Sequence, residues 1–270
     1  MPLLLKAVEP ARGARWVADA FRLYARRPLA FALMLIAFVV AALVISLLLG
    51  VLGLALQLAL VPLLSLGFMV ASQSALLGGP VRPLQFIEPL RGDARRRNAL
   101  LVLCLIYGLS ATGIFYLCDA ISGHGIVRLM LLAGQGSNAQ QEVESLFNDP
   151  LVSEAALVGL TLVMLLSVPF WHAPALVHWG AQGVAQALFS STLALWRTKG
   201  AFLVYSLGWM AALAACCVVG FVLVVLPFTR DLAPLFLAAA MLVTQTVFYV
   251  SLLFSFNDSF GGTDAVTPDA

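Results

Sequence analysis

Six long apolar stretches divide the chain. A membrane-spanning α-helix needs about 20 mainly apolar residues, because the hydrocarbon core is about 30 Å thick and each residue rises about 1.5 Å. The stretches lack the apolar–polar alternation of membrane-barrel strands, so helices must satisfy their backbone polar groups. The predicted spans cover residues 29–49, 51–77, 99–118, 155–177, 201–228 and 232–256. The pattern predicts an all-α integral membrane protein with a six-helix transmembrane bundle.

The short connections pair these spans into three helical hairpins within a single membrane domain, residues 1–270. Gly50 and Gly53 mark a tight first hairpin. The predicted segments are an N-terminal cytoplasmic segment (1–28), hairpin 1 (29–77), a basic elbow (78–98), hairpin 2 (99–177), a second elbow (178–200), hairpin 3 (201–256) and a tail (257–270). Hairpin 2 contains an external insertion, residues 119–154. We expect one or two short helices there, packed over the mouth of the bundle; a mobile acidic loop is the alternative.

Composition agrees with a lipid-facing exterior. Hydrophobic residues make up 62% of the 270 positions and charged residues 10%, with a mean hydropathy of +1.00. A soluble domain carries roughly 25% charged residues. Thirteen of the fifteen basic residues fall in the N-terminal segment and the two elbows, against Arg128 and Arg230 on the other side. Because short loops rich in Lys and Arg stay cytoplasmic, we predict a bacterial inner-membrane protein with both termini in the cytoplasm.

A similar stretch precedes each odd-numbered span, at residues 15–27, 84–97 and 183–199. In the first, Trp16, Ala20, Phe21 and Tyr24 share one face, which predicts an amphipathic interfacial helix with its apolar side in the headgroup region. The apolar stripe of the last consists of Val184, Ala187, Leu188, Ser191 and Leu195. Prolines and Gly92 make the middle copy less regular. We interpret the chain as three repeated units, each a cationic surface helix followed by a hairpin.

The basic side chains at these elbows are candidate contacts for anionic lipid headgroups, since each is worth about 1 kcal/mol near an anionic surface. The candidates are Arg26, Arg27, Arg95, Arg96, Arg97, Arg197 and Lys199. The alternative is that these charges only set the topology. The expected partners are the phospholipid bilayer and its anionic headgroups. We expect no nucleic-acid partner, and the sequence leaves protein partners open.

No Asp, Glu, Lys or Arg lies deep in a predicted span, and His172 is the one titratable candidate there. Pro169 and Pro174 flank it and predict a bend. His172 is either a proton or ligand contact or, as we favour, a neutral imidazole bonded to a freed carbonyl. Tyr205 and Tyr249 also lie at depth, and the other polar residues there are Gln57, Thr244, Gln245 and Thr246. They bond across to neighbouring helices, as is usual in membranes, or line a polar cavity with His172.

Two motifs carry a resemblance to a known family. Residues 173–176 (Ala-Pro-Ala-Leu), followed by residues 196–202 (Trp-Arg-Thr-Lys-Gly-Ala-Phe), resemble an uncharacterised family of six-span proteobacterial inner-membrane proteins. The segment from Trp16 to Arg27 and the Phe260-Gly261-Gly262 motif fit the same pattern. More distantly, the chain looks like the membrane domain that precedes some bacterial glycerophosphodiester phosphodiesterases. Because their catalytic half is absent here, the resemblance implies architecture and location rather than a reaction.

No phosphate-binding loop, metalloprotease motif or nucleophile elbow occurs in the sequence. Asn257 and Asp258 form the sharpest polar pair at the inner end of the last span, and a helix end with its cap explains them best. We therefore expect a non-enzymatic protein without cofactor or metal, acting as a membrane scaffold, sensor or lipid-interacting protein. The alternative is a transporter or channel for an apolar or zwitterionic small molecule.

Overall fold

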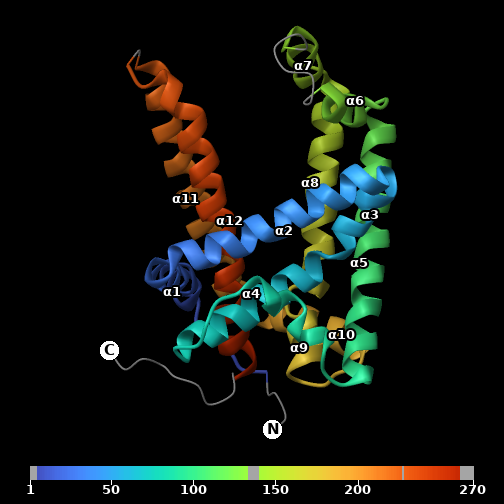
Figure 1. The fold of residues 1–270 in the computed structure, drawn as a ribbon, viewed down its shortest axis with the longest axis vertical. Helices are drawn as coiled ribbons and strands as arrows, with labels where there is room; N and C mark the ends of the chain where they lie inside the picture. The colour runs from blue at the N-terminus through green and yellow to red at the C-terminus, as the bar shows by residue number, and fades with distance from the viewer. Residues whose placement is uncertain (1–4, 133–139, 227, 262–270) are drawn as a thin grey trace.

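A computed structural model describes residues 5–132, 140–226 and 228–261, which form helices and no strands in those ranges (Figure 1). The helices are α1 (Arg12–Arg26), α2 (Pro28–Leu49), α3 (Val51–Ala59), α4 (Val61–Leu76), α5 (Ala94–Ile121), α6 (Gly125–Leu132), α7 (Gln140–Phe147), α8 (Pro150–Phe170), α9 (Ala173–His178), α10 (Val184–Arg197), α11 (Lys199–Val225) and α12 (Ala233–Phe260), with 3₁₀ turns η1 (Pro83–Phe86), η2 (Glu88–Leu90) and η4 (Arg230–Leu232). The all-α prediction is confirmed.

Six segments are long and apolar enough to cross a membrane, as predicted. They are Pro28–Leu49, Leu52–Leu76, Ala94–Ile121, Pro150–His178, Lys199–Val225 and Ala233–Phe260. Two of the six are broken helices. The second span bends at Leu60, just before Pro62, and the fourth is interrupted between Phe170 and Ala173. In both places a proline removes a backbone donor from the helical ladder.

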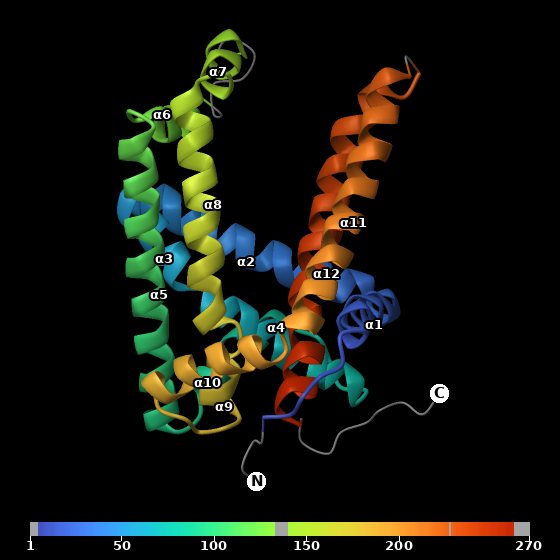
Figure 2. The same ribbon diagram turned by 180° about the vertical axis from the view of Figure 1, so that it is seen from behind.

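The spans do not form a parallel bundle along their whole length. α5 pairs with α8 and α11 with α12, and in both ribbon views the upper halves of these pairs stand apart while α2 crosses between them (Figures 1 and 2). The large buried side chains come instead from the lower halves of these pairs, from α1, α4 and α9, and from the first turn of α2. They include Trp16, Phe31, Leu66, Phe68, Met69, Leu103, Leu176, Tyr205, Val250 and Phe256. The protein core therefore lies towards one end of the bundle.

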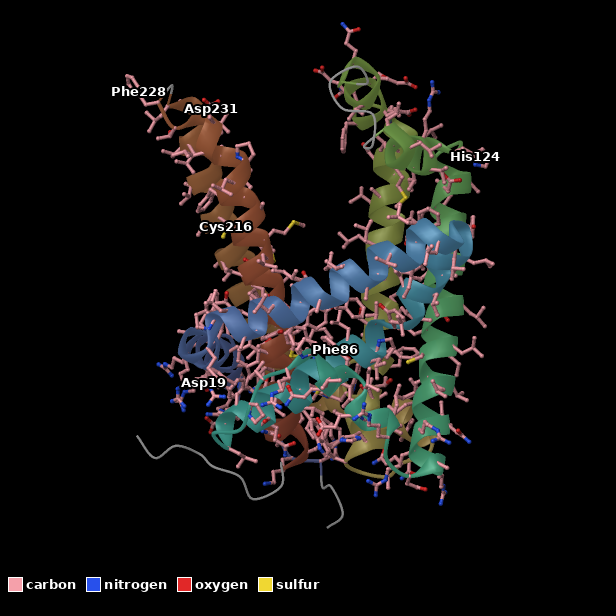
Figure 3. The ribbon with its side chains drawn as sticks, in the orientation of Figure 1. Asp19, Phe86, His124, Cys216, Phe228 and Asp231 are labelled. Carbon is pink, nitrogen blue, oxygen red and sulfur yellow. The ribbon has the colours of Figure 1, made fainter. Side chains whose placement is uncertain are left out.

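This end also carries α1, the first turn of α5, α9 and α10, and we call it the basic end (Figure 2). Figure 3 places Asp19 of α1 there, and places His124 and Asp231 at the tips of the two helix pairs. We call those tips the distal end. Lys6 and Ser259, near the two ends of the described chain, meet at the basic end, where the Lys6 N–H donates to the Ser259 carbonyl at 2.8 Å.

The external insertion forms two short helices, α6 and α7, as one of the alternatives predicted. They contact each other, α5 and α8. They therefore cap the α5–α8 pair, and the prediction that they pack over the mouth of the whole bundle is wrong. Arg128 of α6 donates to Glu142 of α7 at 2.6 Å, which joins the two helices. Residues 133–139 of the insertion lie outside the described residues.

The surface helices α1 and α10 each bury part of their apolar side chains against the protein, while others, such as Phe189 and Trp196 of α10, stay exposed. α1 packs along α11 and α12, and Trp16 and Ala20 have no exposed surface. Trp16 and Ala20, half of the face predicted to enter the headgroup region, are thus covered by protein, whereas Phe21 is exposed and Tyr24 half-buried. Contact of the exposed part with the headgroups stays a prediction. α10 likewise buries Ala187 and Ser191, here against α8 and α9. In the middle elbow the predicted surface helix is replaced by the turns η1 and η2, because Pro83 and Pro89 leave no room for a continuous helix.

The packing of these three segments follows one rule. α10 packs on hairpin 2 (α5 and α8), and η1 packs on hairpin 1 (α2 and α4), so each segment contacts the hairpin that precedes it in the chain. α1 packs mainly on hairpin 3, α11 and α12, and makes smaller contacts with α2 and α4 of hairpin 1. Such a closed cycle is what three equivalent units would give. The internal repeat itself stays a prediction.

Candidate functional site

An ion pair holds α1 against the end of α12. The Arg12 guanidinium donates to both carboxylate oxygens of Asp258, at 2.7 and 2.8 Å, and the Trp16 indole N–H donates to the same carboxylate at 2.7 Å. The hydrogen bond to Asp258 raises the pKa of Arg12 above its usual value. Bidentate contacts of this kind are among the stronger protein hydrogen bonds. Asp258 is therefore not a helix cap, as the sequence suggested, but the anchor of the N-terminal helix.

Gly13 allows α1 to approach α11 closely. A Cβ atom at this position would lie 2.8 Å from the Tyr205 nitrogen and would also collide with the Ala201 carbonyl oxygen. No residue larger than glycine fits without moving one of the two helices. The basic residues that follow in α1 are thereby fixed relative to hairpin 3.

The predicted headgroup residues all lie at the basic end. Six of the seven are exposed: Arg26, Arg95, Arg96, Arg97, Arg197 and Lys199. Arg96 donates to the His178 carbonyl at 3.2 Å, and the Lys199 ammonium lies 5.4 Å from the centre of the Trp196 ring. Arg27 is half-buried. It donates to the carbonyls of Gly78 and Gly79, and so binds the backbone that follows α4.

Arg26 and Arg27 line a cavity of about 290 Å³ between the end of α1 and the end of α4. Leu23, Ala75 and Leu76 supply its apolar lining, and Gly78 completes it. Within the described residues Arg26 makes no ion pair or side-chain hydrogen bond. A guanidinium has five N–H donors, and the two bonds of Arg27 leave several of its own free. The cavity thus combines cationic donors with an apolar wall.

The break in the fourth span is built around Ser191 of α10. In an unbroken helix the N–H of residue 172 would donate to the carbonyl of residue 168. Here the Ser191 hydroxyl stands between them: it accepts from the His172 N–H at 3.0 Å and donates to the Val168 carbonyl at 3.1 Å. A side chain inserted into the ladder is a recognised cause of helix kinks. The sequence predicted the bend, but placed Ser191 among the apolar residues.

The His172 side chain has no exposed surface. Its Nε2 atom lies 3.2 Å from the Ser255 hydroxyl, whereas its buried Nδ1 atom has no hydrogen-bond partner among the described residues. The rings of Phe202, Phe256 and Phe260 surround it at centroid distances of 5.5 to 6.1 Å. The hydrogen-bond partner of His172 is thus the Ser255 hydroxyl, whereas the sequence led us to expect a backbone carbonyl freed by the prolines.

The structure does not bring the predicted polar residues together. Gln57 of α3 donates to the Ala42 carbonyl at 2.8 Å and to Ser46, so it bonds across hairpin 1. Thr246 is buried and donates to Leu242 of its own helix at 2.6 Å. Thr244 is half-buried and Gln245 exposed, on α12. Neither the cavity beside Arg26 nor the cavity between the spans described below is lined by His172 or by any of these residues.

A different cavity lies within the bundle, with a mainly apolar lining and an open side. Its volume is about 150 Å³, and its lining comes from the second, third, fourth and sixth spans. Hydroxyl groups from each of these spans contribute: Ser65, Tyr107, Ser167 and Tyr249. The sequence singled out only Tyr249 among them, as a polar residue at depth, because Ser and Tyr in apolar helices carry no spacing signal. The breaks at Pro62 and Pro169, close to Ser65 and Ser167, are the signal that could have found them.

Both carboxylate oxygens of Asp119, which is buried at the distal end, have hydrogen-bond partners. Asp119 accepts from the Val127 N–H at 2.9 Å and pairs with His124 Nδ1 at 2.8 Å, which fixes the turn from α5 into α6. Among the described residues no three His, Cys, Asp or Glu side chains are grouped so that they could hold a metal ion.

Six apolar helices with the protein core and most basic residues at one end define a multi-pass membrane protein. A probable inner membrane protein of Burkholderia thailandensis is 34% identical to the chain over 209 residues, which make up 76% of this chain and 74% of the relative. The chain belongs to the family of this inner membrane protein. No protein-family model and no solved structure matches the chain.

The predicted family of inner-membrane proteins and the predicted membrane are thus confirmed. No comparison supports the distant likeness to the membrane domain of glycerophosphodiester phosphodiesterases. That likeness, like the orientation of the termini, stays a prediction.

Proposed function

We propose that this protein is a non-enzymatic inner-membrane protein that binds anionic phospholipid at its basic end. The cavity between α1 and α4 carries the proposal, because it places two arginines beside an apolar wall. A lipid phosphate would accept from Arg26 and from the free N–H groups of Arg27, and the glycerol backbone would contact Leu23, Ala75 and Leu76. Arg95, Arg96, Arg97, Arg197 and Lys199 supply a wider cationic surface around this site.

The rigidity of the site also supports this role. Arg27 is held by the carbonyls of Gly78 and Gly79, and α1 is anchored by the pair of Arg12 with Asp258. Charges that only set topology need no such fixed positions. A preorganised pair of guanidinium groups binds a phosphate with less loss of side-chain entropy.

The first test removes the two cavity arginines. The double variant Arg26→Gln/Arg27→Gln should retain roughly 30-fold less phosphatidylglycerol during purification, at about 1 kcal/mol for each arginine. The measurement is the ratio of phosphatidylglycerol to phosphatidylethanolamine in the purified protein. Arg26→Gln alone, which keeps the Arg27 contacts to α4, should lower this ratio about fivefold.

A matched control separates the site from the total charge. Arg15→Gln/Arg22→Gln removes two exposed charges from the same helix but touches no residue of the cavity. This variant should retain far more phosphatidylglycerol than the cavity variant. Equal lipid retention in both double variants would show that only the net charge matters and would refute the site.

We also propose that the basic end faces the cytoplasm, since its side carries thirteen of the fifteen basic residues. In a chain whose four native cysteines are replaced by alanine, Asn148→Cys at the distal end should react with a membrane-impermeant maleimide in cells whose outer membrane is permeabilised. Ala185→Cys on the exposed side of α10 should react only after the inner membrane is opened. The reverse labelling pattern would overturn the orientation.

The non-enzymatic role is supported by the pairing of two carboxylates, the half-buried Asp258 and the buried Asp119. Asp258 binds Arg12 and Trp16, and Asp119 binds His124 and the α6 backbone, so neither is free for proton transfer. The alternative, a transporter or channel, would need a polar cavity for its substrate, and the polar residues at depth that could line one are His172, Gln245 and Thr246. These residues do not meet, so the transport hypothesis loses that support and stays a prediction.

A further inference from the structure

The cavity inside the bundle differs in character from the basic site. Five of its nine lining residues are aromatic: Tyr107, Phe170, Trp171, Phe248 and Tyr249. Their rings are arranged edge to face, with centroid distances of 5.1 Å for Tyr107 with Phe170 and 5.8 Å for Trp171 with Phe248. No lining residue carries a charge at neutral pH. An occupant should therefore be uncharged and should offer a flat face to aromatic edges.

The hydroxyl groups define which polar group the occupant needs. Ser65 donates to the Pro62 carbonyl at 2.9 Å and Ser167 to the Val163 carbonyl at 2.7 Å, so both protons are already used. The Tyr107 hydroxyl makes no hydrogen bond within the described residues. A tyrosine hydroxyl in apolar surroundings is stabilised when it donates to a hydrogen-bond acceptor. The cavity thus presents a free donor, which a carbonyl oxygen on the occupant would satisfy.

The size of the cavity and the route into it further limit which class of molecule can bind there. A protein cavity of roughly 150 Å³ accommodates one six-membered ring, and this cavity has that volume. α8 packs on α5, and α12 packs on α4 and α11, whereas α8 and α12 make little direct contact although both line the cavity. Towards the distal end these two helices separate in both ribbon views (Figures 1 and 2). A lipid tail attached to the ring could leave between them.

We propose that this cavity binds the head ring of a lipid-soluble quinone. A quinone is flat and uncharged, carries ring carbonyls that accept from Tyr107, and reaches its site through the bilayer. The ring lies among Tyr107, Phe170, Trp171, Phe248 and Tyr249, with its tail between α8 and α12. The proposal concerns binding alone and is independent of the headgroup site at the basic end.

The test uses the full chain in lipid nanodiscs and a photoreactive short-chain ubiquinone analogue, with decylubiquinone as competitor. Labelling should fall on the cavity segments of α5, α8 and α12 and should be displaced by decylubiquinone. Tyr107→Phe should weaken labelling about threefold to tenfold, as expected for one lost neutral hydrogen bond. Ser167→Phe, which fills the cavity, should weaken it by more than tenfold.

Two control variants make the same kinds of substitution at positions that do not line the cavity. Tyr116→Phe removes a hydroxyl from an exposed tyrosine of α5, and Thr161→Phe adds a ring to an exposed position of α8. Both should label like the unaltered chain. If Ser167→Phe fails to fold, the nearly isosteric Tyr107→Phe still decides the question. Labelling spread over all lipid-facing helices, labelling equally displaced by a plain fatty alcohol, or unchanged labelling of Tyr107→Phe would overturn the proposal.

Discussion

Replacing Trp16 by alanine should release α1 from the bundle. The Trp16 side chain has no exposed surface, packs edge to face on Phe202 and Tyr205 at 5.3 and 5.8 Å, and donates to Asp258. Removing a buried aromatic side chain costs about 3–5 kcal/mol. For a chain of this size that corresponds to a fall in melting temperature of roughly 6–20 °C, measurable by thermal unfolding of the purified protein in detergent.

Two further variants test whether the loss of stability comes from the docking of Trp16 and not from the loss of any tryptophan. Trp196→Ala truncates a tryptophan on α10 that is 72% exposed, and should change the stability by no more than about 1 kcal/mol. Trp16→Phe keeps most of the packing but loses the bond to Asp258, and should fall between the two. An equal loss of stability for Trp16→Ala and Trp196→Ala would contradict the docking of α1 on hairpin 3.

The second large effect is expected at Ser191. Alanine at this position leaves the His172 N–H and the Val168 carbonyl without the hydroxyl that joins them. An unsatisfied buried polar group costs about 1–3 kcal/mol, so losing both partners should cost about 2 kcal/mol or more. The fall in melting temperature measures this cost, and faster hydrogen exchange at the His172 amide locates it.

Thr192 offers the matched control. It follows Ser191 on α10, is exposed, and donates only to the Leu188 carbonyl of its own helix. Thr192→Ala should change stability by no more than about 0.5 kcal/mol. A Ser191→Ala variant that is as stable as Thr192→Ala, with unchanged exchange at His172, would mean that the break in the fourth span does not depend on this hydroxyl.

The span pattern could be predicted from the sequence because lipid leaves the backbone so few choices. A run of about 20 apolar residues must form a helix, and Pro62 and Pro169 mark both breaks in such runs. The position of the surface helices could not be predicted in the same way. An apolar stripe on α1 fits a lipid surface and a protein groove equally well, and only the tertiary contacts with α11 and α12 decide between them.

The candidate sites could likewise be predicted only in part, because their partners come from distant segments of the chain. Arg26 and Arg27 were found because cations at an elbow are conspicuous in an apolar sequence, yet the cavity they share depends on residues 75–78, some 50 positions away. Asp258 was noticed, but its partner Arg12 lies 246 positions earlier. Ser191, Ser65 and Tyr107 gave no signal, since a single hydroxyl in an apolar helix usually bonds to its own backbone. Each of these sites depends on contacts between residues far apart in the chain, and local sequence patterns do not contain that information.

We propose above all that the basic end holds an anionic phospholipid between α1 and α4. Native mass spectrometry of the purified chain, titrated with phosphatidylglycerol or phosphatidylethanolamine, tests this binding without a reporter. The unaltered chain and Arg15→Gln/Arg22→Gln should bind phosphatidylglycerol in preference, and Arg26→Gln/Arg27→Gln should lose this preference. The same preference in all three proteins would refute the headgroup site.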